Sequence, residues 1–276
     1  FQLRDLSTLY NQTSKTNEDE DLGSQYVLDL LERFNLTAEQ MCEVFDYCKE
    51  KKILHLCTPW DIKSLSILEQ YGIEAYKVAS ADLTNHNLLI EIAKTGRPML
   101  VSTGMSSEAE IIKSIQLLND YGAIYVLLHC NSTYPTPYKD INLNYLSRLK
   151  ELSQGPVGYS GHERGFSVPI AAVALGARVI EKHFTVDRKL EGNDHKVSLE
   201  PEEFQNMVKG IRKVEKAFGK DSKRQISQGE MINRENLAKS LIATISIAKG
   251  DVIANDMIAI RSPGKGLQPI YIEKLV

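Results

Sequence analysis

The side chains best suited to chemistry come directly after short apolar runs. Ammonium, hydroxyl, carboxylate and imidazole groups recur there in this order along the chain: Thr58, Lys77, Ser80, Asp82, Ser102, Thr103, His129, Asn131, Ser132, Tyr134, Ser160, His162, Glu181 and His183. If the runs are parallel strands of a barrel, the groups that follow them converge on the face at their C-terminal ends. The sequence therefore predicts one polar site assembled from several strand ends.

Two of these groups, His162 and His183, follow neighbouring apolar runs. With carboxylates and hydroxyls nearby, such a pair of imidazoles can bind a divalent metal ion. The alternative is that each is an ordinary hydrogen-bonded histidine in a loop. His129 continues the apolar run 124–128, and this position favours a histidine of the core.

Lys77 lies inside an apolar run and leaves three interpretations open. Its ammonium group can snorkel out of a strand end, act as a point charge for a phosphate or carboxylate, or form a Schiff base. The neighbouring side chains Ser80 and Ser102 are hydroxyls. Hydroxyl groups suit an anion pocket better than the apolar pocket that a Schiff-base lysine needs.

The elements that would position these groups alternate between two kinds. Six apolar runs of strand length are separated by amphipathic stretches with helical periodicity; the runs are 53–57, 75–78, 99–101, 124–128, 156–159 and 179–180. Ser107 and Glu110 have the spacing of a helix capping box. This alternation predicts an α/β fold with a parallel sheet.

The parallel sheet can be closed or open. A (β/α)8 TIM barrel needs eight units, and about six fit between residues 53 and 218. A doubly wound sheet would need no further strand, but it gathers its polar residues at one switch point. Polar residues follow nearly every run here, so we favour the barrel.

The character of the sequence changes after residue 218. Residues 219–229 are polar, and short β-rich runs follow at 240–245 and 251–253. We therefore predict three segments, which are a barrel domain at 1–218, a linker at 219–235 and a small β-rich domain at 236–276.

Composition narrows the class of protein. Hydrophobic residues make up 42% and charged residues 25% of the chain, and the net charge is -3. These values are typical of a soluble globular protein and give no reason to expect binding to nucleic acid or to a membrane. The four cysteines contain no CxxC pair, which argues against a zinc ribbon and favours a reducing, cytoplasmic location.

Five motifs resemble, in order, those of the sialic acid synthase (N-acetylneuraminate synthase) family. They are Tyr76–Ser80, Ser102–Met105, His129–Pro135, Gly158–His162 and Glu181–Thr185. The tail resembles the antifreeze-like (SAF) domain of that family at 239–250 and in the Pro263-Gly264 loop. The resemblance implies a (β/α)8 barrel followed by this small domain, in a domain-swapped homodimer.

The resemblance also implies roles for individual residues. It makes His162 and His183 the ligands of Mn²⁺ or Mg²⁺, and Glu181 and Asp82 the catalytic carboxylates. The implied substrate contacts are Gln2, Thr58, Lys77, Ser80, Ser102, Asn131, Ser132, Tyr134, Ser160, Asp194 and Arg261. Ser132 stands where some members have asparagine, Asp82 stands where others have glutamate, and Arg261 is displaced by one residue from the usual arginine-proline pair.

The implied reaction joins phosphoenolpyruvate to N-acetylmannosamine, or to its 6-phosphate, with C–O cleavage and release of phosphate. The family's glutamate-bearing first strand and a phosphate-binding lysine would precede Phe1. We therefore expect a chain that is truncated at both ends and inactive as a fragment, although its parent is an enzyme.

Three other functions compete with this one. A legionaminic or pseudaminic acid synthase would use the same chemistry on another sugar. A phosphoenolpyruvate synthase of the sugar-phosphate type, as in aromatic amino-acid biosynthesis, would need a further basic cluster for the second phosphate. The sequence offers only Lys182 and Arg188 for it, and the antifreeze-like tail argues against this function. A binding or scaffold protein would keep the fold while its site decays.

Overall fold

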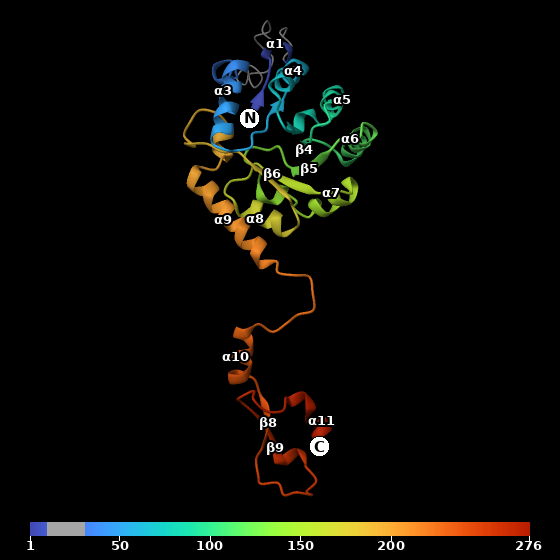
Figure 1. Cartoon of the computed structure of the whole chain (residues 1–276), viewed down its shortest axis with the longest axis vertical. Coiled ribbons are helices and arrows are strands. Elements are labelled where there is room, and N and C mark those ends of the chain that lie inside the picture. The colour runs from blue at the N-terminus through green and yellow to red at the C-terminus, as the bar shows by residue number, and fades with distance from the viewer. Residues whose placement is uncertain (10–30) are drawn as a thin grey trace. The chain divides into compact units, whose positions relative to one another are not determined.

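A computed structural model describes residues 1–9 and 31–276. The chain forms two compact units, residues 1–219 and 220–276, and each is described by itself (Figure 1). None of the described helices is long and apolar enough to cross a membrane.

The first unit is built on a curled parallel sheet of five strands. In chain order the strands are β3 (Tyr76–Val78), β4 (Met99–Ser102), β5 (Tyr125–Cys130), β6 (Val157–Gly161) and β7 (Val179–Lys182). Each strand pairs with the next one along the chain. A doubly wound sheet reverses its strand order at a switch point. The strand order here has no reversal, so the five strands form half of a barrel.

The start of the described chain continues this curl only briefly. Strand β1 (Gln2–Leu3) pairs in parallel with β2 (Thr58–Pro59), and a single bridge from Cys57 to Tyr76 leads from β2 to β3. The strand predicted at 53–57 is therefore wrong in position. Ile53 and Leu54 are exposed, because β1 offers a partner over two residues only.

Helices follow the strands as predicted and flank the sheet (Figure 1). The helices of this unit are α1 (Leu6–Leu9), α3 (Ala38–Glu50), α4 (Ile62–Tyr71), α5 (His86–Lys94), α6 (Glu108–Asp120), α7 (Tyr145–Ser153), α8 (Ser167–Ala174) and α9 (Pro201–Ala217). The capping box predicted at the start of α6 is confirmed, since Ser107 and Glu110 cap each other.

The main core lies between the sheet and the helices. Successive strand residues point to opposite faces, and Tyr76 and Val78 are both buried in this core. Ile111 and Leu118 of α6 pack into the same cluster. Burial of each such aliphatic side chain contributes about 1.5–3 kcal/mol. Because Tyr76 and Val78 both face this core, Lys77 between them points to the other face of the sheet.

The second unit is a small arrangement of helices around a hairpin-like pair. Its elements are α10 (Gln228–Leu237), β8 (Ser240–Ala243), β9 (Ile258–Arg261) and α11 (Ile272–Leu275), and β8 is antiparallel to β9. Gly264 fits tightly here, because a Cβ at this position would lie 2.4 Å from the Arg234 carbonyl oxygen. The segment 219–235, which we expected to be a linker, contains most of α10.

Candidate active site

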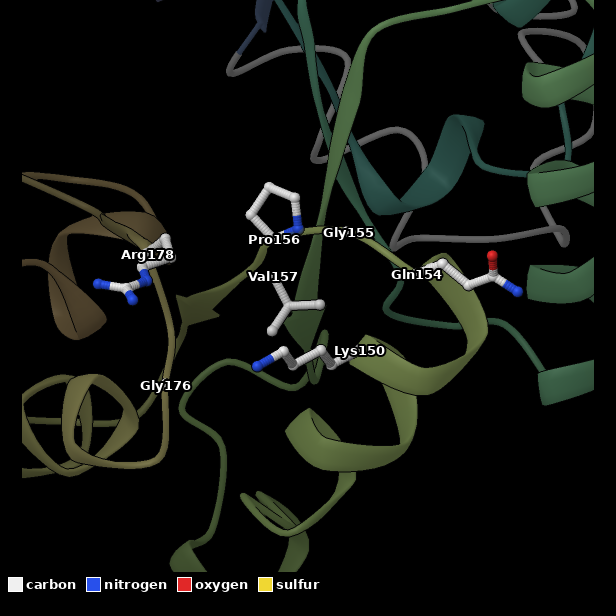
Figure 2. A pocket seen from close by; sticks show the side chains of 7 residues that line it. All are labelled: Lys150, Gln154, Gly155, Pro156, Val157, Gly176 and Arg178. Carbon is white, nitrogen blue, oxygen red and sulfur yellow. The ribbon is translucent and has the colours of Figure 1, made fainter. Parts of the chain in front are cut away.

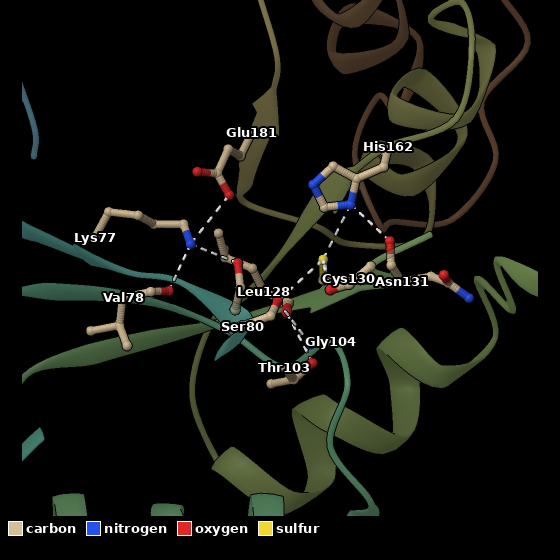
Figure 3. Close-up of polar contacts among 12 residues, drawn as sticks. Lys77, Val78, Ser80, Thr103, Gly104, Leu128, Cys130, Asn131, His162 and Glu181 are labelled. Atoms are coloured by element: carbon tan, nitrogen blue, oxygen red, sulfur yellow. Dashed lines mark hydrogen bonds and ion pairs between the residues drawn. The ribbon is translucent and has the colours of Figure 1, made fainter. Parts of the chain in front are cut away.

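Lys77 extends from β3, the first strand of the five-stranded sheet, on the inner face, which is opposite the core. Its Nζ donates hydrogen bonds to Ser102 Oγ and to the Val78 carbonyl, both at 2.7 Å, and lies 3.5 Å from Glu181 Oε2 (Figure 3). The side chain is only 11% exposed, so it does not snorkel. Burial lowers the pKa of Lys77, and the Glu181 carboxylate opposes this shift.

The loops after β3, β4 and β5 bring hydroxyl groups together beside this lysine. The Gly104 amide donates to Ser80 Oγ at 3.1 Å, and Ser80 Oγ donates to Cys130 Sγ at 3.5 Å. A Cβ on Gly104 would lie 2.3 Å from Ser132 Oγ and 2.7 Å from Ser80 Oγ. Glycine at this position therefore lets both hydroxyls approach the backbone. Of the hydroxyls predicted around Lys77, Ser102 is in direct contact with its ammonium group.

His162 follows β6 and is held by two polar contacts. Its Nδ1 lies 2.7 Å from the Asn131 carbonyl oxygen, and its Nε2 lies 2.8 Å from the Tyr134 hydroxyl. Because a carbonyl only accepts, Nδ1 carries the proton and Nε2 keeps its lone pair. Burial alone would lower the pKa of His162, but Cys130, the Asn131 carbonyl and Glu181 together raise it.

His183 follows β7 and faces His162. The two ring centroids are 5.1 Å apart, and His183 Nδ1 lies 3.8 Å from Asp194 Oδ2. Burial lowers the pKa of His183, and the Asp194 carboxylate opposes the shift. The structure therefore brings together the two histidines that the sequence singled out.

The donors fit an open site for a divalent cation. Two imidazoles from adjacent strand ends face each other, and His162 presents an unprotonated Nε2 once the Tyr134 hydroxyl moves aside. Residues 1–9 and 31–276 contain no cluster of three or more histidine, cysteine or acidic side chains arranged around one point. An ion bound to the two histidines would thus keep positions open for oxygen ligands from substrate and water.

Asp82 lies in the short helix η2 (Ser80–Asp82) just after β3. Its Oδ1 accepts a hydrogen bond from Asn85 Nδ2 at 2.9 Å, while its buried Oδ2 has no partner within the described part of the chain. Burial raises the pKa of Asp82. Because an unpaired buried oxygen is costly, this carboxyl group is suited to receive a donor from a ligand.

The other predicted residues are distributed unevenly. Ser160 pairs in register with Glu181 on the inner face, Thr58 is buried in β2, and the side chain of Asp194 is largely exposed near His183. Gln2 is exposed on β1, where its side chain accepts a hydrogen bond from Trp60. Arg261 ends β9 in the second unit, which is described separately from this site.

Three further positions can be compared with the sequence interpretation. The prediction that His129 is a core histidine is confirmed, since it is buried and its Nε2 lies 2.6 Å from the Ile141 carbonyl oxygen. The sequence interpretation missed Cys130, which lies 3.7 Å from His162 Nδ1. Its alternation with the core residue His129 could have placed it on the inner face. Lys182 does not join the anion pocket, because its ammonium group pairs with Glu163.

A shallow hollow of about 320 Å³ lies at the other end of the strands (Figure 2). Its lining residues come from the start of β6 and from the segments before β6 and β7: Lys150, Gln154, Gly155, Pro156, Val157, Gly176 and Arg178. It contains none of the predicted site residues. The polar cluster around Lys77 and His162 therefore remains the better candidate for chemistry.

Comparison with known proteins decides the family. Residues 1–223 match the NeuB family. The chain belongs to the NeuB family. It is 36% identical to the N,N'-diacetyllegionaminic acid synthase of Campylobacter jejuni, over 90% of this chain and 75% of that protein. It is also 36% identical to the human N-acetylneuraminate-9-phosphate synthase, over 86% of this chain and 67% of that protein.

A solved structure of the NeuB type supports the fold as well. The sialic acid synthetase of Leptospira borgpetersenii, in complex with citrate, superposes with a TM-score of 0.73 at 32% identity. The match covers 86% of this chain and 80% of that one. The chain is thus a NeuB-family sugar acid synthase whose curled sheet corresponds to part of a barrel.

Proposed function

We propose that this NeuB-family protein condenses phosphoenolpyruvate with an open-chain N-acetylated amino sugar, N-acetylmannosamine or its 6-phosphate, to give a sialic acid and phosphate. The observation that carries the proposal is the buried Lys77 ammonium group, which lies among hydroxyls and opposite Glu181. A small, multiply charged anion requires a fixed cation with several hydrogen-bond donors. Lys77, Ser80, Ser102 and Ser160 would supply this pocket.

The neighbouring histidines would hold the second substrate in place. His162 and His183 would bind Mn²⁺ or Mg²⁺, which when bound supplies Lewis acidity to the aldehyde oxygen. Tyr134 lies against both rings, with centroid distances of 4.1 and 5.7 Å, so its side chain would contact the sugar. Asp82 and Asp194 would accept hydrogen bonds from sugar hydroxyls or amides.

The chemistry assigns a proton-transfer role to Glu181. C3 of phosphoenolpyruvate attacks the aldehyde carbon, water adds to the resulting cationic C2, and phosphate leaves with cleavage of its C–O bond. Glu181 extends from β7 toward Lys77, and its side chain is 39% exposed. A carboxylate placed between a cation and solvent can take the proton of the attacking water. Lys77 balances the negative charge and forms no covalent bond.

A second candidate is the same reaction on a dideoxy-diacetamido sugar. The relatives named for legionaminic acid and for N-acetylneuraminate 9-phosphate are equally identical to this chain, at 36%. The lysine and histidine residues serve the chemistry common to both, so they do not separate the two substrates. For the whole protein we propose a cytoplasmic, domain-swapped homodimer in which Arg261 reaches the partner's site.

The test is phosphate release by the full protein with phosphoenolpyruvate, Mn²⁺ and N-acetylmannosamine. We expect release that depends on Mn²⁺ and is lost in His183→Ala. Lys77→Met should also lower phosphate release. Lys150→Met is its control, because Lys150 lines the hollow at the other end of the strands. Release with a dideoxy-diacetamido sugar alone would move the assignment to the second candidate. Absence of phosphate release with every sugar would favour a binding protein and contradict the proposal.

A further inference from the structure

A buried ion pair lies directly behind the two histidines. Lys182 Nζ is 3.0 Å from Glu163 Oε1, and the two side chains are 0% and 1% exposed. The same ammonium group donates a hydrogen bond to the Glu163 backbone carbonyl. The Tyr159 hydroxyl donates to Glu163 Oε2 at 2.6 Å. Both carboxylate oxygens are therefore occupied by donors from two different strands.

This network occupies the face of the sheet opposite to the candidate site. Ser160 and Glu181 pair in register and face the site. Because side chains alternate along a strand, Tyr159 and Lys182 point to the other face, where Tyr159 belongs to the hydrophobic core. The ion pair consequently cannot touch a substrate bound beside Lys77.

Gly161 provides the space that the carboxylate occupies. A Cβ at this position would lie 2.6 Å from Glu163 Oε2 and 2.8 Å from Glu163 Oε1. With any other residue at position 161, the Glu163 carboxylate or the Tyr159 ring would have to move from its present place. This fit is an observation independent of the ion pair itself.

The pair joins the two segments that carry the histidines. Glu163 immediately follows His162, and Lys182 immediately precedes His183. Separate hydrogen bonds hold each segment, from the Thr136 amide to the His162 carbonyl at 3.1 Å and from the Leu199 amide to the His183 carbonyl at 2.8 Å. Those bonds anchor each histidine singly. The ion pair adds a side-chain link between the two segments at the point where the pairing of β6 with β7 ends, at Gly161 and Lys182.

We propose that Glu163 and Lys182 are positioning residues that set the separation of His162 and His183. The proposal rests on the proposed function, in which the two histidines bind a divalent cation. A buried ion pair is often no more stabilising than apolar side chains of similar volume. The geometric link between the two histidine segments gives this pair a role that apolar packing would not replace.

The test measures Mn²⁺ binding by the full protein, using the electron paramagnetic resonance signal of free Mn²⁺. The main variant is the double substitution Glu163→Met with Lys182→Met, which leaves no unpaired buried charge and so should keep the fold. The pair does not contact the imidazole rings, but loss of groups that orient metal ligands typically weakens binding about 10–100-fold. We expect a weakening of this size in the double variant, with an unchanged circular dichroism spectrum.

A control pair at the first strand of the same sheet has the same kind of partners but is more accessible, with Arg97 and Glu69 31% and 34% exposed. Tyr76, Glu69 and Arg97 form a similar trio, in which Arg97 Nε donates to Glu69 Oε1 at 2.6 Å and the Tyr76 hydroxyl donates to the same oxygen. Glu69 lies on α4, away from both histidines. The double substitution Glu69→Met with Arg97→Met should leave Mn²⁺ affinity within about twofold of the parent. Equal weakening in both double variants would overturn the positioning role.

A second readout needs no metal. Imidazole nitrogen resonances of His162 and His183 in the metal-free protein should shift or broaden in the Glu163/Lys182 variant and stay unchanged in the control. Mn²⁺ binding that survives both His162→Ala and His183→Ala would overturn the proposed metal site, and the inference with it. Binding that is lost in those variants but intact in the Glu163/Lys182 variant would overturn the inference alone.

Discussion

Two lysine–glutamate pairs lie on opposite faces of the same sheet, and they differ in separation and in exposure to solvent. On the inner face, Lys77 and Glu181 are 3.5 Å apart and their side chains are 11% and 39% exposed. On the outer face, Lys182 and Glu163 are 3.0 Å apart and sealed from solvent. The inner pair can exchange partners with a ligand, whereas the outer pair cannot. The same two residue types thus form an accessible pair at the candidate site on one face and a sealed pair on the other.

The largest expected effect comes from breaking the outer pair on one side only. Lys182→Met leaves the Glu163 carboxylate buried without its cation. Removal of one partner of a buried pair costs about 3–5 kcal/mol of folding free energy. Chemical denaturation should show this loss, and Glu163→Met added to Lys182→Met should restore most of it. A single variant as stable as the parent would contradict the sealed, paired geometry.

Substitution in the inner pair should affect activity strongly and folding stability little, which is the reverse of what we expect for the outer pair. Lys77→Met should lower kcat/KM for phosphate release by about 100–1000-fold, because a preorganised cation is worth about 2.7–4 kcal/mol in a transition state. Its folding free energy should change little, because Glu181 remains open to solvent. Steady-state kinetics and thermal melting measure the two quantities. Full activity in this variant would show that Lys77 is not part of the anion pocket.

A smaller effect is expected from filling the space beside the outer pair. Gly161→Ala puts a methyl group 2.6 Å from Glu163 Oε2, and overpacking of this kind costs about 1–3 kcal/mol. Thermal melting should detect the loss, while Gly229→Ala, where no atom lies within 4 Å of the added Cβ, serves as the control. Equal stability in the two variants would mean that Glu163 moves without cost.

The smallest expected effect concerns Asp82, whose buried Oδ2 has no hydrogen-bond partner within residues 1–9 and 31–276. Its pKa is raised, so between the ordinary value of 3.8 and the folded pKa the native state binds more protons than the unfolded state. Stability from this group is complete below the ordinary value and is lost as pH rises through the folded pKa. Asp82→Asn should therefore stabilise the protein by about 1–2 kcal/mol at neutral pH.

The pH dependence of the stability difference shows whether Asp82→Asn stabilises the protein by removing a buried carboxylate or by improving packing. Denaturation of the parent and of Asp82→Asn should converge as pH falls toward 3.8, while sugar condensation should weaken in the variant at every pH. A stability difference that stays constant with pH would show that the Asp82 carboxyl group titrates normally.

The sequence by itself determined the family, the α/β class and most of the strand ends. Its signals are local, because a short apolar run and the polar residues after it are neighbours in the chain. Lys77 with Ser102, and His162 with His183, could thus be predicted to meet. The alternation of Glu181 and Lys182 even contained the information that these two residues face opposite sides of the sheet.

Only the tertiary structure decided which partners these side chains meet. Lys182 reaches Glu163 across 19 residues of chain, and the pairing depends on the register of β6 with β7. The Asn131 carbonyl fixes the tautomer of His162, and the buried Oδ2 of Asp82 has no partner among the residues that the structure describes. Such contacts follow from strand register and loop path, which are set by packing of the whole unit and leave no mark in the local sequence.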